Sequence, residues 1–312
     1  MFLSLKKTTV IALMTLLFFS SCQKDPVVEN NSSKQITEGF VLDADTLGIL
    51  TTTKVADTYV HLYHSTSGAQ VNSYAIESRN KVVIVDALHF QSRGEEMRNF
   101  ANFLEKDIER VLVSHAHADH YMALGNFKDL PTYATSDAIT NIANEGEATR
   151  LFRISLGEPF LSEYPDSVTI PENVVETSFT VDDIKYETFN FINTEAKDQM
   201  LLKIPSLKMI HTADLVTIGG HQILIDPEQI INAIQYIKAL EGEGYTTLLT
   251  GHNGMEDMSV LDPVLQYLYT AKSILDTNPT AADYQTQIEA AYPSYGDASF
   301  VVLLMDNAGA FN

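Results

Sequence analysis

The sequence predicts an α/β fold in which two β-sheets pack face to face and helices cover both outer faces, a four-layer αββα sandwich. Two observations favour this fold. In each half of the chain, short β-rich runs come first and helical segments follow them. Apolar residues make up 45% of the 312 residues and charged residues 20%, a balance that excludes a disordered chain, a collagen and a coiled coil.

The first half of the chain contains a clear succession of strands and helices. Runs of β-branched and aromatic residues between turn residues predict strands, and a helical apolar period predicts helices. The run Arg110–Ser114 holds a continuous apolar stretch, as expected for a strand that is covered on both faces. These criteria give strands at 58–64, 72–77, 81–86, 110–114 and 131–134, and helices at 91–105 and 136–145.

The second half repeats the order of strands and then helices, without an internal repeat at a fixed period. The same criteria predict strands at 168–170, 176–180, 186–192, 200–204, 208–211 and 245–250. Helices are expected at 227–241, 263–275 and 280–291, so that two helices close the chain.

The first 22 residues have the organisation of an export signal. Lys6 and Lys7 precede the apolar run Val10–Phe19, which is shorter than the ~20 residues of a comfortable membrane-spanning helix. The run ends at Ser20-Ser21-Cys22 and resembles a bacterial lipoprotein signal, whose cleavage leaves a lipidated cysteine. An ordinary cleaved signal with an incidental cysteine is the alternative.

The predicted export signal divides the chain into three parts. We expect a lipoprotein signal peptide at 1–22, a flexible tether at 23–45 and a single domain at 46–312. The protein is then exported and anchored through lipidated Cys22 to a bacterial cell membrane, where it faces the periplasm or the cell surface.

Charge and cysteine content exclude several classes of protein. The formal net charge is −21, and no local basic patch is present to hold nucleic acid phosphates, so we expect no nucleic acid partner. Cys22 is the single cysteine, which excludes a disulfide framework and a cysteine-based zinc site.

A dense group of metal-binding residue types follows the strand 110–114. His115, His117, Asp119 and His120 occupy six consecutive positions. On an extended strand end, residues i and i+2 project to the same side, so His115 and His117 can hold one ion. The turn that follows can present Asp119 and His120 to a second ion. Imidazole and carboxylate ligands suit zinc, and also iron or manganese.

The pattern His-x-His-x-Asp-His after a strand resembles the metal signature of the metallo-β-lactamase superfamily, over about residues 51–253. The resemblance implies the four-layer fold and two divalent metal ions. It also implies that Asp214 of Thr212-Ala213-Asp214 bridges the two metals, although Ala213 replaces the usual glycine. His252 of Gly251-His252 resembles the last histidine ligand, and Asp86 resembles the aspartate that supports the site from behind.

One ligand position departs from the usual pattern of the family. No histidine lies between His120 and His211, where most members carry a histidine ligand. Glu195, in Thr194-Glu195-Ala196, resembles the glutamate ligand of alkylsulfatases with this fold. Asp198 is the alternative ligand, or the position is empty or filled by water. His221 resembles an active-site histidine of the same branch and is a candidate catalytic residue, against a solvated loop histidine.

The remaining strand histidines are expected to be mainly structural. His211 ends a strand one turn of chain before Asp214. His61 and His64 have opposite parity on the first predicted strand, so they should face different sides of the sheet. One of these two histidines can reach the site.

The resemblance implies a metal-dependent hydrolase that acts on a small-molecule substrate with a metal-activated hydroxide, most simply with zinc. Asp119 would orient the hydroxide or take its proton, and His221 would help the leaving group depart. The fold serves many substrate classes, and small neutral or singly charged esters and lactones are the favoured class. No arginine lies beyond Arg153, which argues against a sulfate-binding set. The alternatives are an alkylsulfatase-like or β-lactam-cleaving enzyme, or a catalytically inactive metal-binding lipoprotein.

Overall fold

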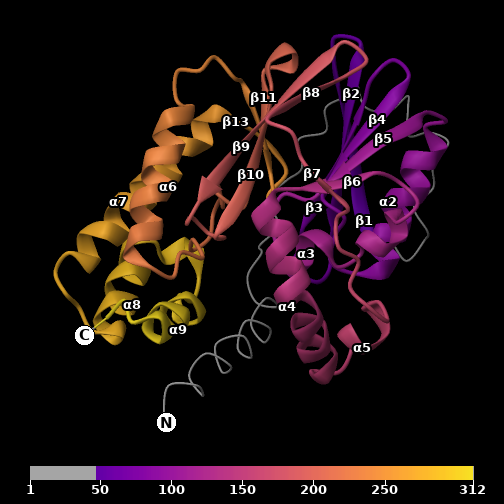
Figure 1. Ribbon diagram of the computed structural model, residues 1–312. Coiled ribbons are helices and arrows are strands. Elements are labelled where there is room, and N and C mark those ends of the chain that lie inside the picture. The colour runs from indigo at the N-terminus through magenta and orange to yellow at the C-terminus, as the bar shows by residue number, and fades with distance from the viewer. Residues whose placement is uncertain (1–46, 312) are drawn as a thin grey trace.

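The structure is a computed structural model that describes residues 47–311. The expected signal peptide, the lipidated Cys22 and the tether lie outside the described residues. The described chain forms two β-sheets that pack face to face, with helices on both outer sides (Figure 1).

The first sheet has seven strands in sequence order. β1 to β4 are antiparallel, and β4 to β7 are parallel. The strands are β1 (Gly48–Val55), β2 (Thr58–Ser65), β3 (Asn72–Glu77), β4 (Lys81–Val85), β5 (Asp107–Leu112), β6 (Thr132–Ala134) and β7 (Asn173–Val174).

The second sheet has six strands in the order β13-β12-β11-β10-β9-β8. Only β11 and β12 pair in parallel among these strands. The strands are β8 (Ser178–Val181), β9 (Ile184–Ile192), β10 (Asp198–Ile204), β11 (Met209–Ala213), β12 (Thr247–Thr250) and β13 (Met255–Asp257).

Helices cover the outer face of each sheet. In Figure 1, α2 lies outside the first sheet, and α6 and α7 lie outside the second. The α-helices are α2 (Gln91–Phe103), α3 (Ala118–Tyr121), α4 (Ser136–Ser155), α5 (Phe160–Glu163), α6 (Pro227–Leu240), α7 (Leu261–Leu275), α8 (Ala281–Ala291) and α9 (Ser299–Ala308). The 3₁₀ turns are η1 (Leu124–Phe127), η2 (Pro205–Leu207), η3 (Met258–Val260) and η4 (Pro293–Tyr295).

Alternating side chains of the strands build three apolar layers. In β4, Val83 and Val85 enter the core between the sheets, whereas Val82 and Ile84 pack toward the first set of helices. In β12, Leu249 enters the core between the sheets and Leu248 packs toward the second set. Both faces of each sheet are therefore buried, which confirms the predicted four-layer αββα fold.

The structure adds elements that the sequence patterns did not predict. β1 pairs with β2 along its whole length, although its Thr-rich sequence has no strong apolar period. A third closing helix, α9, follows the two that were expected. It was not predicted, because its apolar run SFVVLLM is equally compatible with a strand. The expected strand at 168–170 does not form.

Helix α4 extends ten residues beyond its predicted end, to Ser155 instead of residue 145. The prediction stopped before Gly146, a residue with low helix propensity. A Cβ atom at Gly146 would lie 3.2 Å from the hydroxyl oxygen of Tyr121, so the glycine leaves space for the Tyr121 side chain beside α4.

Within residues 47–311, none of the helices combines the length and apolar character that crossing a bilayer requires.

Candidate metal centre

Apart from Glu195, which lies in the turn between the antiparallel β9 and β10, the predicted metal-binding side chains follow the carboxyl ends of parallel strands from both sheets. His115, His117, Asp119 and His120 come after β5. Asp214 directly follows β11 and His252 lies two residues after β12. A backbone hydrogen bond of 2.8 Å from the Met200 amide to the Ser114 carbonyl joins the two sheets at this edge. Loops at the carboxyl ends of strands are the usual place for ligand sites in α/β folds.

Cluster one consists of His115, His117 and Glu195 together with Asp214, and its candidate ligand atoms lie within 4.8 Å of one another. His117 Nδ1 lies 3.1 Å from Glu195 Oε1. His115 Nε2 lies 3.8 Å from Glu195 Oε2 and 3.5 Å from Asp214 Oδ2. Glu195 therefore lies among the candidate ligand atoms of cluster one.

Cluster two consists of Asp119, His120 and His252, again together with Asp214. Asp214 Oδ2 lies 3.1 Å from His120 Nε2 and 3.2 Å from His252 Nε2. Asp119 Oδ2 lies 3.7 Å from His120 Nε2 and 3.5 Å from His252 Nε2. The two clusters meet at one carboxylate, that of Asp214.

Two small residues allow Asp214 to reach both clusters. A Cβ atom at Gly251 would lie only 1.8 Å from Asp214 Oδ1, so a glycine is needed beside the carboxylate. Ala213 has a φ of 46°, in the left-handed region that favours glycine. The family's usual glycine before the bridging aspartate therefore has a conformational reason, and Ala213 adopts the same backbone at some cost.

Cluster two is supported from behind by a buried carboxylate. Asp86 is completely buried and accepts hydrogen bonds from the Ser114 amide at 2.7 Å and the Ser114 hydroxyl at 2.9 Å. Its Oδ2 also lies 2.8 Å from His120 Nδ1. This contact orients the ring so that Nε2 faces Asp214, the arrangement by which carboxylates hold metal-ligating histidines. The Ala69 carbonyl lies 3.0 Å from His252 Nδ1 and plays the same part for that ring.

Cluster one is supported by neutral groups. The Gln199 side-chain Nε2 donates to Glu195 Oε2 at 3.2 Å, and the Thr194 hydroxyl donates to the side-chain Oε1 of Gln199 at 2.9 Å. The Ser114 hydroxyl lies 3.0 Å from His115 Nδ1. The sequence analysis assigned no role of their own to Gln199 and Gly251, because neither residue type is a usual metal ligand.

The clusters concentrate opposite charges in a buried space. Burial lowers the pKa of His117, but the negative charge of Glu195 outweighs this effect and raises the pKa to about 9. Burial and Asp214 compete in the same way at His252, whose pKa also rises to about 9. Burial raises the pKa of Asp214, but His120 and His252 lower it well below the usual value. The Asp214 carboxylate therefore remains ionised and favours bound positive charge.

The chemistry of this donor set fits two divalent metal ions. Each cluster offers imidazole nitrogens and carboxylate oxygens, the ligand types of zinc, iron and manganese. His115 Nε2 and Asp214 Oδ1 are among the buried side-chain atoms of residues 47–311 that lack a hydrogen-bond partner. Buried polar atoms without partners are rare, and a ligated metal ion would satisfy both.

The structure does not bring His221 to the clusters. His221 Nδ1 lies 3.1 Å from the Tyr267 hydroxyl, and Nε2 lies 3.2 Å from the Gly296 carbonyl. Both ring nitrogens thus face groups of the C-terminal helical region. The other candidate ligand, Asp198, has a side chain outside the described part of the structure.

The other strand histidines contact neighbours outside both clusters. His211 is completely buried, and its ring packs edge-on to Tyr74 at 5.6 Å. His61 lies between Thr52 and Glu77, at 2.8 and 2.9 Å, on the side of α2. His64 Nδ1 lies 2.7 Å from Asn72 Oδ1. Neither of the two β2 histidines belongs to the ligand clusters.

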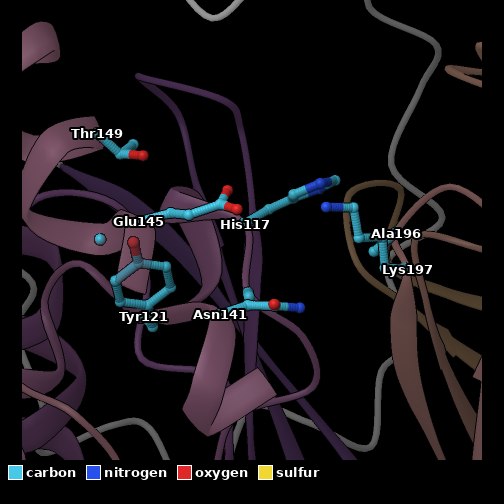
Figure 2. Close-up of a pocket in the computed structure, with 9 residues that line it drawn as sticks. His117, Tyr121, Asn141, Glu145, Thr149, Ala196 and Lys197 are labelled. Atoms are coloured by element: carbon cyan, nitrogen blue, oxygen red, sulfur yellow. The ribbon is translucent and has the colours of Figure 1, made fainter. Parts of the chain in front are cut away.

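A pocket of about 120 Å³ opens beside His117 (Figure 2). Helix α4 forms one wall with Asn141, Glu145 and Thr149, which are spaced four residues apart and so share a face. Lys197, from the turn between β9 and β10, lines the pocket from the other sheet. The side chain of His117 is 33% exposed, so the pocket gives access to cluster one.

Comparisons with solved structures identify the same fold. A metallo-β-lactamase from Pontibacter korlensis superimposes with a TM-score of 0.55 at 16% identity, over 71% of this chain and 99% of that one. FIM-1 from Pseudomonas aeruginosa, solved in its mono-zinc form, gives a TM-score of 0.54 at 15% identity, over 72% and 96%. A metallo-β-lactamase from Erythrobacter litoralis gives 0.52 at 13%, over 70% and 96%.

No curated protein sequence matches the chain. The family model of the metallo-β-lactamase superfamily matches residues 66–254, more than half of the 312 residues and a span that contains both ligand clusters. The chain therefore belongs to the metallo-β-lactamase superfamily.

Proposed function

We propose that the protein is a metal-dependent hydrolase that acts on small esters or lactones with two divalent metal ions. The observation that carries the proposal is the geometry of Asp214, whose carboxylate belongs to two ligand clusters at once. Two ions held so close together supply a nucleophile at neutral pH and a Lewis acid for the substrate oxygen. His115, His117 and Glu195 would hold one ion, and Asp119, His120 and His252 would hold the other.

Asp119 is the candidate catalytic residue for proton transfer. Burial raises its pKa, but the charges of His120 and His252 outweigh burial and hold the pKa below its usual value. The carboxylate is therefore ionised at neutral pH and can accept a proton from an attacking water. Its side chain is 16% exposed, so it lies at the boundary between the clusters and the solvent. A positioned carboxylate base typically contributes about 10²- to 10⁴-fold to the rate.

Zinc is the default metal for this ligand set, and iron and manganese are the alternatives. Glu195 replaces a neutral imidazole with a carboxylate, which adds one negative charge to cluster one. This charge makes the bound ion a weaker Lewis acid and favours harder ions slightly more than an all-histidine set does.

The activity is tested on the purified protein loaded with zinc, iron or manganese. We expect hydrolysis of short esters or lactones, and a loss of at least about 100-fold in kcat in Asp119→Asn. A β-lactam and an alkyl sulfate ester serve as comparison substrates. If protein with two bound ions hydrolyses no substrate of the panel, the hydrolase proposal fails and a metal-binding lipoprotein without catalysis takes its place.

We also propose that the enzyme is exported and held at a bacterial membrane by a lipid on Cys22. Support comes from the basic, apolar and small-residue regions that precede this cysteine. Fractionation of cells expressing the full chain tests the anchor. Cys22→Ser should move the protein from the membrane to the soluble fraction and abolish palmitate labelling. Membrane association that survives this substitution would contradict the lipid anchor.

A further inference from the structure

The pocket beside His117 carries two opposite charges on opposite walls. Glu145 projects from α4 and Lys197 from the turn between β9 and β10. Figure 2 shows the Lys197 and Glu145 side chains reaching toward His117 from opposite sides of the pocket. Neither side chain forms an ion pair within residues 47–311, although both line the same pocket. Each charge is therefore available to an oppositely charged group of a ligand that enters the pocket beside His117.

Apart from the ring of Tyr121, the rest of the pocket wall consists of polar or small residues. Asn141 and Thr149 stand one helical turn to either side of Glu145 on α4. Ala196 and Gly146 leave the centre free of large side chains, and the volume of about 120 Å³ suits a group of only a few heavy atoms. The pocket therefore does not resemble an apolar slot for an acyl chain.

The position of the pocket connects it to the reaction. His117 is both a member of cluster one and part of the pocket lining. Lys197 and Ala196 directly follow Glu195, another member of cluster one. A substrate whose reacting bond lies at the clusters would extend its next few atoms along His117 into this pocket.

We propose that this pocket binds a zwitterionic α-amino carboxylate arm of the substrate. Lys197 receives the carboxylate, and Glu145 receives the ammonium group, with Asn141 and Thr149 beside it. The proposal rests on the proposed hydrolase function and narrows its substrate class to esters or lactones that carry an amino-acid-like end. Lys197 and Glu145 are then specificity-determining residues that do not touch the reacting bond.

Binding of three matched hydroxamates tests the proposal without turnover, because a hydroxamate binds the metal ions directly. Glutamate γ-monohydroxamate carries both charges of the arm, glutarate monohydroxamate carries only the carboxylate, and pentanohydroxamate carries neither. Calorimetry on the metal-loaded protein should give the tightest Kd for the first probe. Because exposed ion pairs are weak, each charge should contribute about a 2- to 5-fold change in Kd.

Two variants separate the two charges. Lys197→Met should remove the advantage of the carboxylate in both charged probes, whereas Glu145→Gln should remove only the advantage of the ammonium group. Lys128→Met removes an exposed lysine elsewhere and should change none of the three affinities. Equal affinities of the wild type for all three probes would overturn the proposal, as would equal effects of Lys197→Met and Lys128→Met.

A second measurement keeps the test valid if metal loading fails. Titration of the isotopically labelled, metal-free protein with L-alanine should shift amide signals at 141–149 and 196–197, and Lys197→Met should abolish the shifts. Shifts without any hydrolase activity would support the pocket and contradict the proposed function. The absence of shifts at these residues would contradict the pocket.

Discussion

The two ligand clusters share the carboxylate of Asp214 but are built from different supporting groups. Cluster two is held by the buried carboxylate of Asp86 behind His120 and by a backbone carbonyl behind His252. Cluster one is held by two neutral groups, the Gln199 amide that donates to Glu195 and the Ser114 hydroxyl that accepts from His115 Nδ1. Besides Asp214, each cluster has one carboxylate of its own, that of Glu195 in cluster one and that of Asp119 in cluster two.

The difference lies in the groups behind the candidate ligands. In cluster two a buried aspartate lies behind His120, whereas the groups behind the ligands of cluster one are neutral. A carboxylate behind an imidazole fixes its orientation and raises its basicity. The two clusters should therefore differ in affinity, in proton release and in their response to substitution.

The largest effect is expected where one change reaches both clusters. In Gly251→Ala the new Cβ would lie 1.8 Å from Asp214 Oδ1, so the shared carboxylate must rotate away. We expect both ions to be lost and activity to fall at least about 1,000-fold, since displacing only a supporting group already costs 10- to 100-fold in metal affinity. Metal analysis by mass spectrometry together with circular dichroism checks this result.

A matched glycine provides the control. In Gly220→Ala the nearest atom to the new Cβ is 3.8 Å away, which is an ordinary contact. This variant should keep both ions. Retention of two ions in Gly251→Ala, with an unchanged fold, would contradict the sharing of Asp214.

Proton release on metal binding should differ between the clusters. His117 in cluster one, with a pKa of about 9, is protonated at pH 7 and must lose its proton to bind a metal ion. In cluster two, burial lowers the pKa values of His120 and His252, but the nearby carboxylates outweigh burial. They raise both pKa values, that of His252 to about 9. Binding should therefore strengthen as pH rises from 7 toward 9, by about 10-fold per pH unit in cluster one and about 100-fold in cluster two.

Calorimetry in buffers of different ionisation enthalpy measures this proton release. Glu195→Ala, which keeps the ligands of cluster two, should release about two protons per ion. His252→Ala, which keeps cluster one, should release about one. Equal values in the two variants would remove the electrostatic distinction between the clusters.

Substitution of a supporting group should weaken one cluster more than the other. Asp86→Asn removes the charge behind His120 and should weaken binding at cluster two by about 10- to 100-fold. Gln199→Leu removes the amide beside Glu195 and should weaken cluster one by about 10-fold. Competition with a fluorescent chelator measures both affinities, and the opposite pattern of losses would refute these assignments.

The smallest expected effect concerns the backbone that precedes the shared ligand. Ala213 has a φ of 46°, and a glycine adopts this conformation without the steric cost. The gain is partly offset because glycine makes the unfolded chain more flexible. Ala213→Gly should therefore stabilise the fold by only about 0.5 kcal/mol, without a change in metal content. Chemical denaturation measures the difference, and a loss of more than about 1 kcal/mol would show that Ala213 is not strained.

Much of the fold and of the ligand set could be predicted from the sequence because the information is local. The run from His115 to His120 follows a strongly apolar strand, and Asp214 and His252 each follow another. Strand periodicity places such residues at one edge of a sheet without knowledge of the tertiary structure. Glu195 was found from its neighbours Thr194 and Ala196, by resemblance to a known ligand motif.

The features that escaped prediction depend on tertiary contacts. β1 forms because β2 offers a partner along its whole length. Gly251 matters because the Asp214 carboxylate, 37 residues earlier in the chain, packs against it. Gln199 matters because the turn before β10 brings its side chain beside Glu195. Thr149 lies beyond the predicted end of α4, so the pocket wall could not be assembled from the sequence. His221 has the sequence context of an active-site residue, but the C-terminal helical region provides its partners.

Metal content of the purified protein tests the central claim most directly. Mass spectrometry should find close to two ions per chain in the wild type, close to one in Glu195→Ala, and fewer than one in Asp214→Ala. This order follows from one cluster that needs Glu195 and from a shared carboxylate that both clusters need. Two ions per chain in Glu195→Ala would contradict the ligand role of the glutamate, and little metal in the wild type would contradict the dinuclear centre altogether.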